Sequence, residues 1–455
     1  MKKLFMFAVL AGASFTTAFA QQEDPDKYYI RNSLYMIKLD EAAPNEEYAN
    51  AYEIMNATFD KIDFAKSYER YNDFALTERH IDFDATPEAT QAEQDAFGKK
   101  NMVELALDDY LKSQGLKKAR SEYEYAARLS KYFDQQSTAN KLVAKWFSEQ
   151  GTPEGKVKID EKMQTIYELG LKGLSQEAYD NAVATSSLTG LAQGSADKLI
   201  GNSYVCVVRY GYVPAEEYVA VAQAAINAIG SRLGGIGALA SLGANAIASK
   251  IKGYFIRSNA YLFQVDWKPE LQTRIYTEYW GKDEATQQKL MSDDNFKLKY
   301  VGKSSKYAPG AMTMKAAALD KLIERGTLRA TDKAFAALQR DHEEFRPMAS
   351  LHEEGGKLIA KIGMKEGIKS GDKFNVFEMV QSKNGADIEW KNVGTIKVNK
   401  GCVWDNRAGA GEKIEGEAED KSDKDEEEGT KNPWTEFKEK PSGKIHEGCM
   451  IRLTK

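Results

Sequence analysis

Few residues in this chain are of the types that usually carry chemistry. It has four histidines and three cysteines among 455 residues. His342 and His352 form its one histidine cluster, but a zinc-protease helix needs two histidines on one face, and the required position is occupied by Arg346. The sequence also contains no phosphate-binding glycine loop, no Gly-x-Ser-x-Gly elbow and no Cys-x-x-Cys pair. We therefore predict no catalytic, cofactor-binding or metal-binding residues and expect a protein that is not an enzyme.

Cys402 and Cys449 are the cysteines with the most informative surroundings. Each shares strand parity with apolar neighbours, Cys402 with Val398 and Cys449 with Ile451, so both thiols are predicted to point into the same small domain. In an oxidising compartment they could form a disulfide that closes the base of an acidic loop. Packing as two small apolar side chains is an equally good interpretation. Cys206 falls in a predicted buried strand, where an inert thiol is expected.

Trp390 and Trp434 are the aromatic residues with a candidate ligand-stacking role. Both lie near predicted turns, where exposed rings could stack on sugars. A tryptophan that packs inside the fold or along its edge is the commoner case. The sequence leaves both interpretations open.

The segment 218–249 is rich in glycine and alanine and has a single charged residue. Gly230 and Gly234 have the GxxxG spacing that lets helices approach closely, and Gly237 and Gly243 follow in the same segment. These four glycines are candidate interface residues for self-association. A packed helical hairpin or a mobile insertion is the main alternative. The apolar part is too short and too rich in glycine for a convincing membrane span, so we expect no membrane insertion.

The start of the chain has the order of a secretory signal peptide. Lys2 and Lys3 precede an apolar run at residues 4–13, and Ala18-Phe19-Ala20 supplies the small residues that precede a cleavage site. The sequence therefore predicts that residues 1–20 direct export, to the periplasm of a bacterium or onto its outer membrane. Loss of the two lysines changes the formal net charge from -5 to -7, which gives no general attraction to nucleic acid.

The pattern of apolar residues predicts an α+β chain in three parts. Residues 21–150 are expected to be mostly helical, with one strand near their start. Residues 151–347 are expected to form an α/β domain into which the glycine- and alanine-rich segment is inserted. Its predicted strands lie at 204–208 and 254–267, and its predicted long helix lies at 312–345.

In the last part, residues 348–455, the apolar period changes to two. Short strands separated by glycines are predicted at 358–362, 373–380, 393–398, 402–404 and 449–453. They favour a small SH3-like β-barrel, with a sandwich as the alternative. Residues 411–429 carry ten acidic residues and three lysines, so we predict a disordered acidic loop there.

The last third of the chain carries five distinctive phrases: FRP at 345–347, AKIGMKEG at 360–367, GDKFNV at 371–376, WDNR at 404–407 and GCMIR at 448–452. Together they resemble a family of secreted proteins of Bacteroidetes envelopes. The resemblance extends less sharply through about the last 260 residues. It implies a protein of the cell envelope.

A more distant resemblance begins with SADKL at 195–199, before a predicted buried strand, and ends with the Gly-Asp-x-Phe-x-Val phrase of the terminal part. This arrangement is similar to the periplasmic parts of the curli secretion lipoprotein family and of a flagellar outer-membrane ring protein. It implies an α/β domain followed by a β-barrel, and a role in envelope assembly without catalysis. The chain departs from the curli family because it lacks the lipidated cysteine and the paired membrane-spanning hairpins.

Three classes of function are compatible with these observations. We expect first a non-enzymatic envelope protein that assembles with itself or with protein partners, since the export signal and the resemblance both favour it. A glycan- or peptidoglycan-binding module is the alternative, favoured by the aromatic content of 11%. A hydrolase of an unfamiliar type is the third possibility that the residues leave open.

Overall fold

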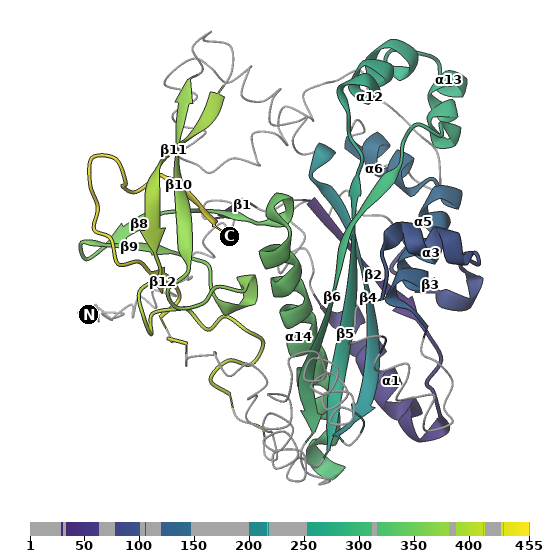
Figure 1. Cartoon of the computed structure of the whole chain (residues 1–455), viewed down its shortest axis with the longest axis horizontal. Helices are drawn as coiled ribbons and strands as arrows, with labels where there is room; N and C mark the ends of the chain where they lie inside the picture. The colour runs from purple at the N-terminus through teal and green to yellow at the C-terminus, as the bar shows by residue number, and fades with distance from the viewer. Residues whose placement is uncertain are drawn as a thin grey trace, which may run out of the picture.

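The computed structural model of the chain (Figure 1) describes residues 29–30, 33–62, 78–100, 105, 120–146, 200–215, 217, 253–311, 316–381, 388–412, 414, 429–430 and 432–454. These residues form a mixed α/β structure with open sheets, which confirms the expected mixture of helices and strands. The signal segment, the glycine- and alanine-rich segment and most of the acidic loop lie outside the described residues. Among the helices that are described, none is long and apolar enough to cross a membrane.

A five-stranded sheet forms the centre of the molecule, in the order β3-β2-β4-β5-β6. Its strands are β2 (Ser33–Asp40), β3 (His80–Asp82), β4 (Ser203–Pro214), β5 (Tyr254–Val265) and β6 (Leu298–Ala311). β3, β2 and β4 run parallel, whereas β5 and β6 each run antiparallel to the strand before them. Because β2 pairs directly with β4, the expected boundary at residue 150 passes through a single sheet.

Two helices cover one face of the central sheet. Met36, Cys206 and Leu262 alternate with residues of the opposite face, as strand geometry requires, and they pack beneath α1 (Ala49–Lys61) and α14 (Ala316–Asp341). The predicted helix at 312–345 is therefore confirmed as α14, which lies alongside β6 (Figure 1).

The opposite face packs against α5 (Glu122–Gln135) and α6 (Thr138–Trp146). Leu129, Val143 and Val207 belong to this second apolar core. The remaining helical elements are short: η2 Glu46–Tyr48, η4 Phe83–Ala85, α3 Gln91–Phe97, α12 Pro269–Arg274, the π-helix η6 Ile275–Tyr279, α13 Glu284–Gln288, η7 Lys289–Ser292, η8 Glu343–Phe345 and η9 Met364–Glu366.

The C-terminal module contains two further sheets around one apolar core. The five-stranded sheet has the order β1-β7-β13-β10-β11, with β1 Tyr29–Ile30, β7 Met348–Ser350, β13 Met450–Leu453, β10 Lys373–Gln381 and β11 Ile388–Lys397. The three-stranded sheet has the order β12-β9-β8, with β12 Thr435–Glu436, β9 Lys357–Ala360 and β8 His352–Glu354. Leu358, Phe374 and Ile451 from both sheets pack into the shared core.

The described strands of this module do not close into the expected SH3-like barrel. β1 and β11 are the edges of one sheet, and β8 and β12 are the edges of the other. The strand expected at 402–404 does not form. The turn at 400–401, in which the Cys402 backbone N–H donates to the Asn399 carbonyl oxygen at 3.3 Å, leads into irregular chain at 402–403. Only Trp404 joins a ladder there, through isolated bridges to Gly363 and Thr430.

Candidate functional site

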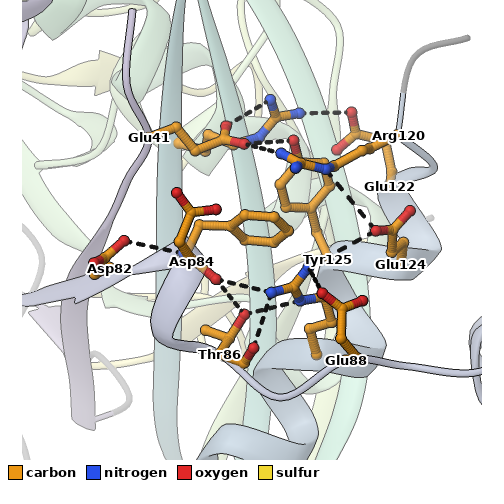
Figure 2. A network of polar contacts seen from close by, with 12 residues as sticks. Glu41, Asp82, Asp84, Thr86, Glu88, Arg120, Glu122, Glu124 and Tyr125 are labelled. Carbon is orange, nitrogen blue, oxygen red and sulfur yellow. Dashed lines mark hydrogen bonds and ion pairs between the residues drawn. The ribbon is translucent and has the colours of Figure 1, made fainter.

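The parallel part of the central sheet contains a topological switch point. The chain passes from β2 to β3 on one side and later to β4 on the other side of β2. In open α/β sheets, ligand sites form outside the carboxyl ends of the strands at such a point. Here Glu41 directly follows β2, and the start of α5 lies across the cluster from it (Figure 2). We call the polar residues that meet at this edge the switch-point cluster: Glu41, Arg120, Glu122, Tyr125, Arg209, Arg257 and Tyr261.

Arg209 is the centre of the cluster. It is buried on β4, on the face that carries α5. Its Nη1 lies 3.1 Å from Glu41 Oε2, and its Nη2 lies 2.8 Å from Glu122 Oε1. Its guanidinium carbon also lies 4.0 Å from the centre of the Tyr125 ring. Two carboxylates and an aromatic face thus offset the cost of burying this charge.

Two tyrosines complete the hydrogen bonding of the carboxylates. The Tyr125 hydroxyl donates to Glu41 Oε1 at 2.7 Å, and the Tyr261 hydroxyl donates to Glu122. Asn259 Nδ2 is a further donor to Glu122 Oε1, at 3.3 Å. Residues from β4, α5 and β5 are therefore fixed to one another through polar groups.

Burial and neighbouring charges shift the pKa values of three groups in the cluster away from neutral pH. Burial raises the pKa of Glu122, but the charges of Arg209 and Arg257 outweigh it, so the pKa lies below its usual range. Burial raises the pKa of Tyr125, and the carboxylate of Glu41 adds to the effect although Arg209 opposes it. Burial and Glu122 likewise raise the pKa of Tyr261 well above its ordinary value. The carboxylates are thus kept ionised and the tyrosines neutral.

A second arginine fixes α5 against the turn that follows β3. Arg128 donates to the carbonyl oxygens of Phe83 at 3.0 Å and of Thr86 at 2.8 Å. Its guanidinium carbon lies 4.0 Å from the centre of the Phe83 ring, and its Nη1 lies 3.3 Å from Glu88. Figure 2 shows Thr86 and Glu88 on this lower side of the cluster. These contacts place the first turn of α5, and with it Glu122 and Tyr125.

A pocket with a volume of about 410 Å³ adjoins the cluster. It is lined by residues of α3, of the turn after it and of the start of α5: Gln91, Gln94, Asp95, Gly98, Lys99, Lys100, Leu105, Arg120, Ser121, Tyr123 and Glu124. Arg120 belongs to both the pocket and the cluster, since its Nη1 lies 3.4 Å from Glu41 Oε1. Lys303 Nζ lies 4.5 Å from the centre of the Tyr123 ring. The pocket therefore has both charges and one aromatic wall.

The candidate cysteines are not joined by a disulfide in the structure. Cys449 is buried next to β13, and its thiol lies 3.8 Å from the Lys444 carbonyl oxygen. Cys402 is half-buried just after the turn that follows β11, outside any strand, so strand parity does not apply to it. Its carbonyl oxygen accepts a hydrogen bond from the backbone N–H of Glu436 in the three-stranded sheet. The prediction that both thiols point inward is therefore correct for Cys449 alone.

The other candidate residues fall in different places. Trp390, on β11, and Trp434, just before β12, are each half-buried, so each ring is partly covered. The four glycines Gly230, Gly234, Gly237 and Gly243 lie outside the described residues. None of these positions belongs to the switch-point cluster.

The histidines give no metal site in the part of the chain that the structure describes. His80 instead lies between two carboxylates, with Nδ1 3.0 Å from Asp40 Oδ2 and Nε2 2.8 Å from Asp60 Oδ1. The two carboxylates lie on opposite sides of the ring, so they do not converge on one point. His80 thereby links β3 to the end of β2 and to α1.

Sequence reasoning missed the switch-point cluster, although one signal for it was present. Arg209 is the one charged residue in the apolar strand β4, and a buried strand rarely holds a charge without a partner. Its partners Glu41, Glu122 and Tyr261 are scattered along the chain, so no local motif joins them.

No protein-family model matches this chain, and no curated protein is similar enough to give a match.

Proposed function

We propose that this protein is an exported, non-enzymatic component of a bacterial cell envelope that works by binding protein partners or further copies of itself. It acts in the periplasm or at the outer membrane. The order of basic, apolar and small residues at 2–20 supports export. The resemblance to secreted envelope proteins and to curli and flagellar assembly proteins supports an assembly role.

The observation that carries the proposal is the fixed polar network of the switch-point cluster, in which Arg209 is bound by Glu41 and Glu122. A general acid or base works best with a pKa near the operating pH. In the cluster the pKa of Glu122 is lowered, and the pKa values of Tyr125 and Tyr261 are raised. The ionised Glu122 and the neutral tyrosines are suited to a fixed network of ion pairs and hydrogen bonds and not to transferring protons. They support a scaffold that presents a binding surface.

The pocket beside the cluster offers such a surface. Arg120 and Glu124 line it from the start of α5, and Lys99 and Leu105 line it from the other side. The Leu105 side chain is 50% exposed, which is unusual for a large apolar residue in this structure. An apolar contact surrounded by charged groups is the composition of a specific protein interface.

Site-specific photo-crosslinking in the native envelope tests the proposal. A photoreactive residue replaces Lys99, an exposed residue of the pocket, in the full chain expressed in its own host. We expect discrete adducts with envelope proteins or with a second copy of the chain. The matched control carries the same residue at Lys440, which is exposed in the C-terminal module. Identical adduct patterns at both positions, or none at Lys99, would contradict a binding role for the pocket.

The partial exposure of Trp390 and Trp434 favours a second candidate function, glycan or peptidoglycan binding. Sedimentation with purified peptidoglycan tests it. If the rings stack on sugars, Trp390→Ala and Trp434→Ala should reduce the bound fraction, while Trp390→Phe and Trp434→Phe should keep most of it. Equal sedimentation of all variants would remove this candidate.

A further inference from the structure

Arg257 is the arginine of the switch-point cluster that makes no direct ion pair, although its charge interacts at longer range with Glu122. It lies half-buried on β5, and no carboxylate of the described residues lies within ion-pair distance of it. Its Nε is buried and has no hydrogen-bond partner in that part of the chain. The Nε of the adjacent Arg209 is buried and unpartnered in the same way. Unpaired donors of a cationic group are costly to bury, so this arrangement calls for an acceptor.

A glycine shapes the space around the Arg257 guanidinium. Gly211 pairs with Arg257 across β4 and β5. A Cβ on Gly211 would lie 3.3 Å from both Nε and Nη2 of Arg257. The Arg257 side chain therefore extends over β4 at Gly211, because glycine has no side chain to block it. This places the guanidinium beyond the carboxyl end of β2, at the switch point, where ligands of α/β sheets bind.

The charges of the cluster leave an excess of cations. Glu41 and Glu122 both bind Arg209, and Arg120 lies near Glu41 and 4.0 Å from Glu124. The charge of Lys303 adds to those of Arg209 and Arg257 around Glu122, so cations outnumber carboxylates. The side-chain hydrogen-bond partner of Arg257 is a neutral hydroxyl, that of Tyr307 on β6. Arg209 and Arg257 are close enough to repel each other. One added negative charge would balance this pair, as the existing carboxylates do for Arg209 alone.

We propose that the switch-point cluster is an anion-binding site in which the guanidinium of Arg257, supported by Arg209, binds a carboxylate or phosphate group of a ligand. The planar fork of an arginine fits either group through two parallel hydrogen bonds. The Gly211 position provides the room for the guanidinium, and Tyr307 holds it from the other side. This inference is independent of the proposed assembly role.

Calorimetric titration of the full exported chain tests the site, with inorganic phosphate and acetate as separate probes at constant ionic strength. We expect saturable binding of at least one anion at one site per chain. Arg257→Gln should weaken it by about tenfold or more, as expected for loss of charge-assisted hydrogen bonds. Gly211→Ala should also weaken binding, because its Cβ displaces the guanidinium. Arg452→Gln, at a half-buried arginine of the C-terminal module, is the matched control and should bind like the unchanged protein.

The outcomes separate the two ligand chemistries. If phosphate binds and acetate does not, the ligand group is a phosphate. If phosphate and acetate compete with each other, the same site also accepts a carboxylate. Circular dichroism shows whether each variant is folded, and Arg257→Lys, which keeps the charge but loses the fork, should give an intermediate affinity. Absence of saturable binding to the unchanged protein would overturn the inference. Unchanged affinity in folded Arg257→Gln would also overturn it.

Discussion

A single arginine in an apolar strand marks the switch-point cluster of the central sheet. Arg209 interrupts the buried residues of β4, and a charge in that position is stable only with good partners. Glu41, Glu122 and the Tyr125 ring supply them. The cluster therefore holds α5 and the end of β2 against β4, and its stability depends on the complete set of partners.

Removing Arg209 should cost far more than removing a surface arginine. Arg209→Met removes the cation that Glu41 and Glu122 share in a largely buried site, and we expect the free energy of unfolding to fall by about 3 kcal/mol. The triple variant Arg209→Met, Glu41→Gln and Glu122→Gln should recover part of this loss. Urea denaturation measures the change. Arg452→Met, on an exposed ion pair, is the control and should change stability by about 1 kcal/mol or less.

Asp293 should make the stability depend on pH in the acid range. Burial raises its pKa, but hydrogen bonds from Tyr279, Asn295 and Arg274 lower it to about 2. Because the pKa of Asp293 in the folded protein lies below its ordinary value, the ionised carboxylate stabilises the fold at any pH above that ordinary pKa. That stabilisation, roughly 2 kcal/mol, is lost as the pH falls toward the folded value.

The test compares the unchanged protein with Asp293→Asn by urea denaturation at several pH values. The stability difference should be largest above about pH 5 and should shrink toward pH 2. Asp294→Asn, at a fully exposed neighbour, controls for the general effect of acid. A difference that stays constant over this range would show that the Asp293 carboxylate is not responsible.

The candidate site could be predicted only in part because its information is not local. The sequence places Arg257 in the predicted strand at 254–267, whereas the strand predicted at 204–208 ends just before Arg209, which belongs to the longer β4 of the structure. Their partners Glu41 and Glu122 are two of 68 acidic residues, and nothing in the sequence separates them from the others. Strand pairing and the placement of α5 bring them together, and both depend on tertiary structure.

At the scale of elements, the contact between α14 and β6 depends on a glycine in the middle of the helix. A Cβ at Gly326 would lie 2.8 Å from the Pro309 carbonyl oxygen and 2.9 Å from the Gly310 Cα. Gly326→Ala should therefore destabilise the protein by about 1–3 kcal/mol, although alanine is the better helix former by about 1 kcal/mol. Urea denaturation shows whether the substitution lowers or raises the free energy of unfolding. Gly443→Ala, where no atom lies within 4 Å, should leave stability nearly unchanged, and a stabilising Gly326→Ala would disprove the close contact.

Elements of four or more residues with a clear apolar pattern were predictable, and the two-residue strands were not. β4, β5, β10 and α14 each have a sustained apolar pattern, and the sequence locates all of them. β1 and β12 have two residues each, which is too short for any period. They exist because β7 and β9 offer them backbone hydrogen bonds, so their formation depends on distant parts of the chain.

At the scale of the molecule, the expected division into consecutive parts is replaced by interleaved ones. Residues 33–40 join the central sheet, whereas Tyr29–Ile30 of β1 join the C-terminal module. Periodicity reports which face of a strand is buried, but it does not report the neighbouring strand. The sequence therefore predicts the three kinds of structure in their order along the chain. It does not predict that a strand from the start of the chain pairs with a strand of the C-terminal module.

Arg340, at the end of α14, is one of the residues through which this helix holds the C-terminal module; Arg325 binds Glu412 in the same way. The Nη1 of Arg340 lies 2.6 Å from Asp372 Oδ2 and 2.6 Å from the Gly367 carbonyl oxygen. In Figure 1, α14 stands between the module and the sheet. Since Arg340 satisfies two acceptors of the module at once, we expect Arg340→Leu to loosen the module while the central sheet stays intact, at a cost of about 1–2 kcal/mol.

Hydrogen exchange followed region by region separates this effect from general destabilisation. In Arg340→Leu, exchange should rise at residues 364–381, which carry η9 and β10, and stay unchanged in β4 and β5. Lys357→Leu removes an exposed ion pair with Glu436 inside the module and should leave all regions unchanged. Equal increases in the module and the sheet would mean that the two unfold as one unit. No increase at all would mean that apolar packing, and not Arg340, holds the module in place.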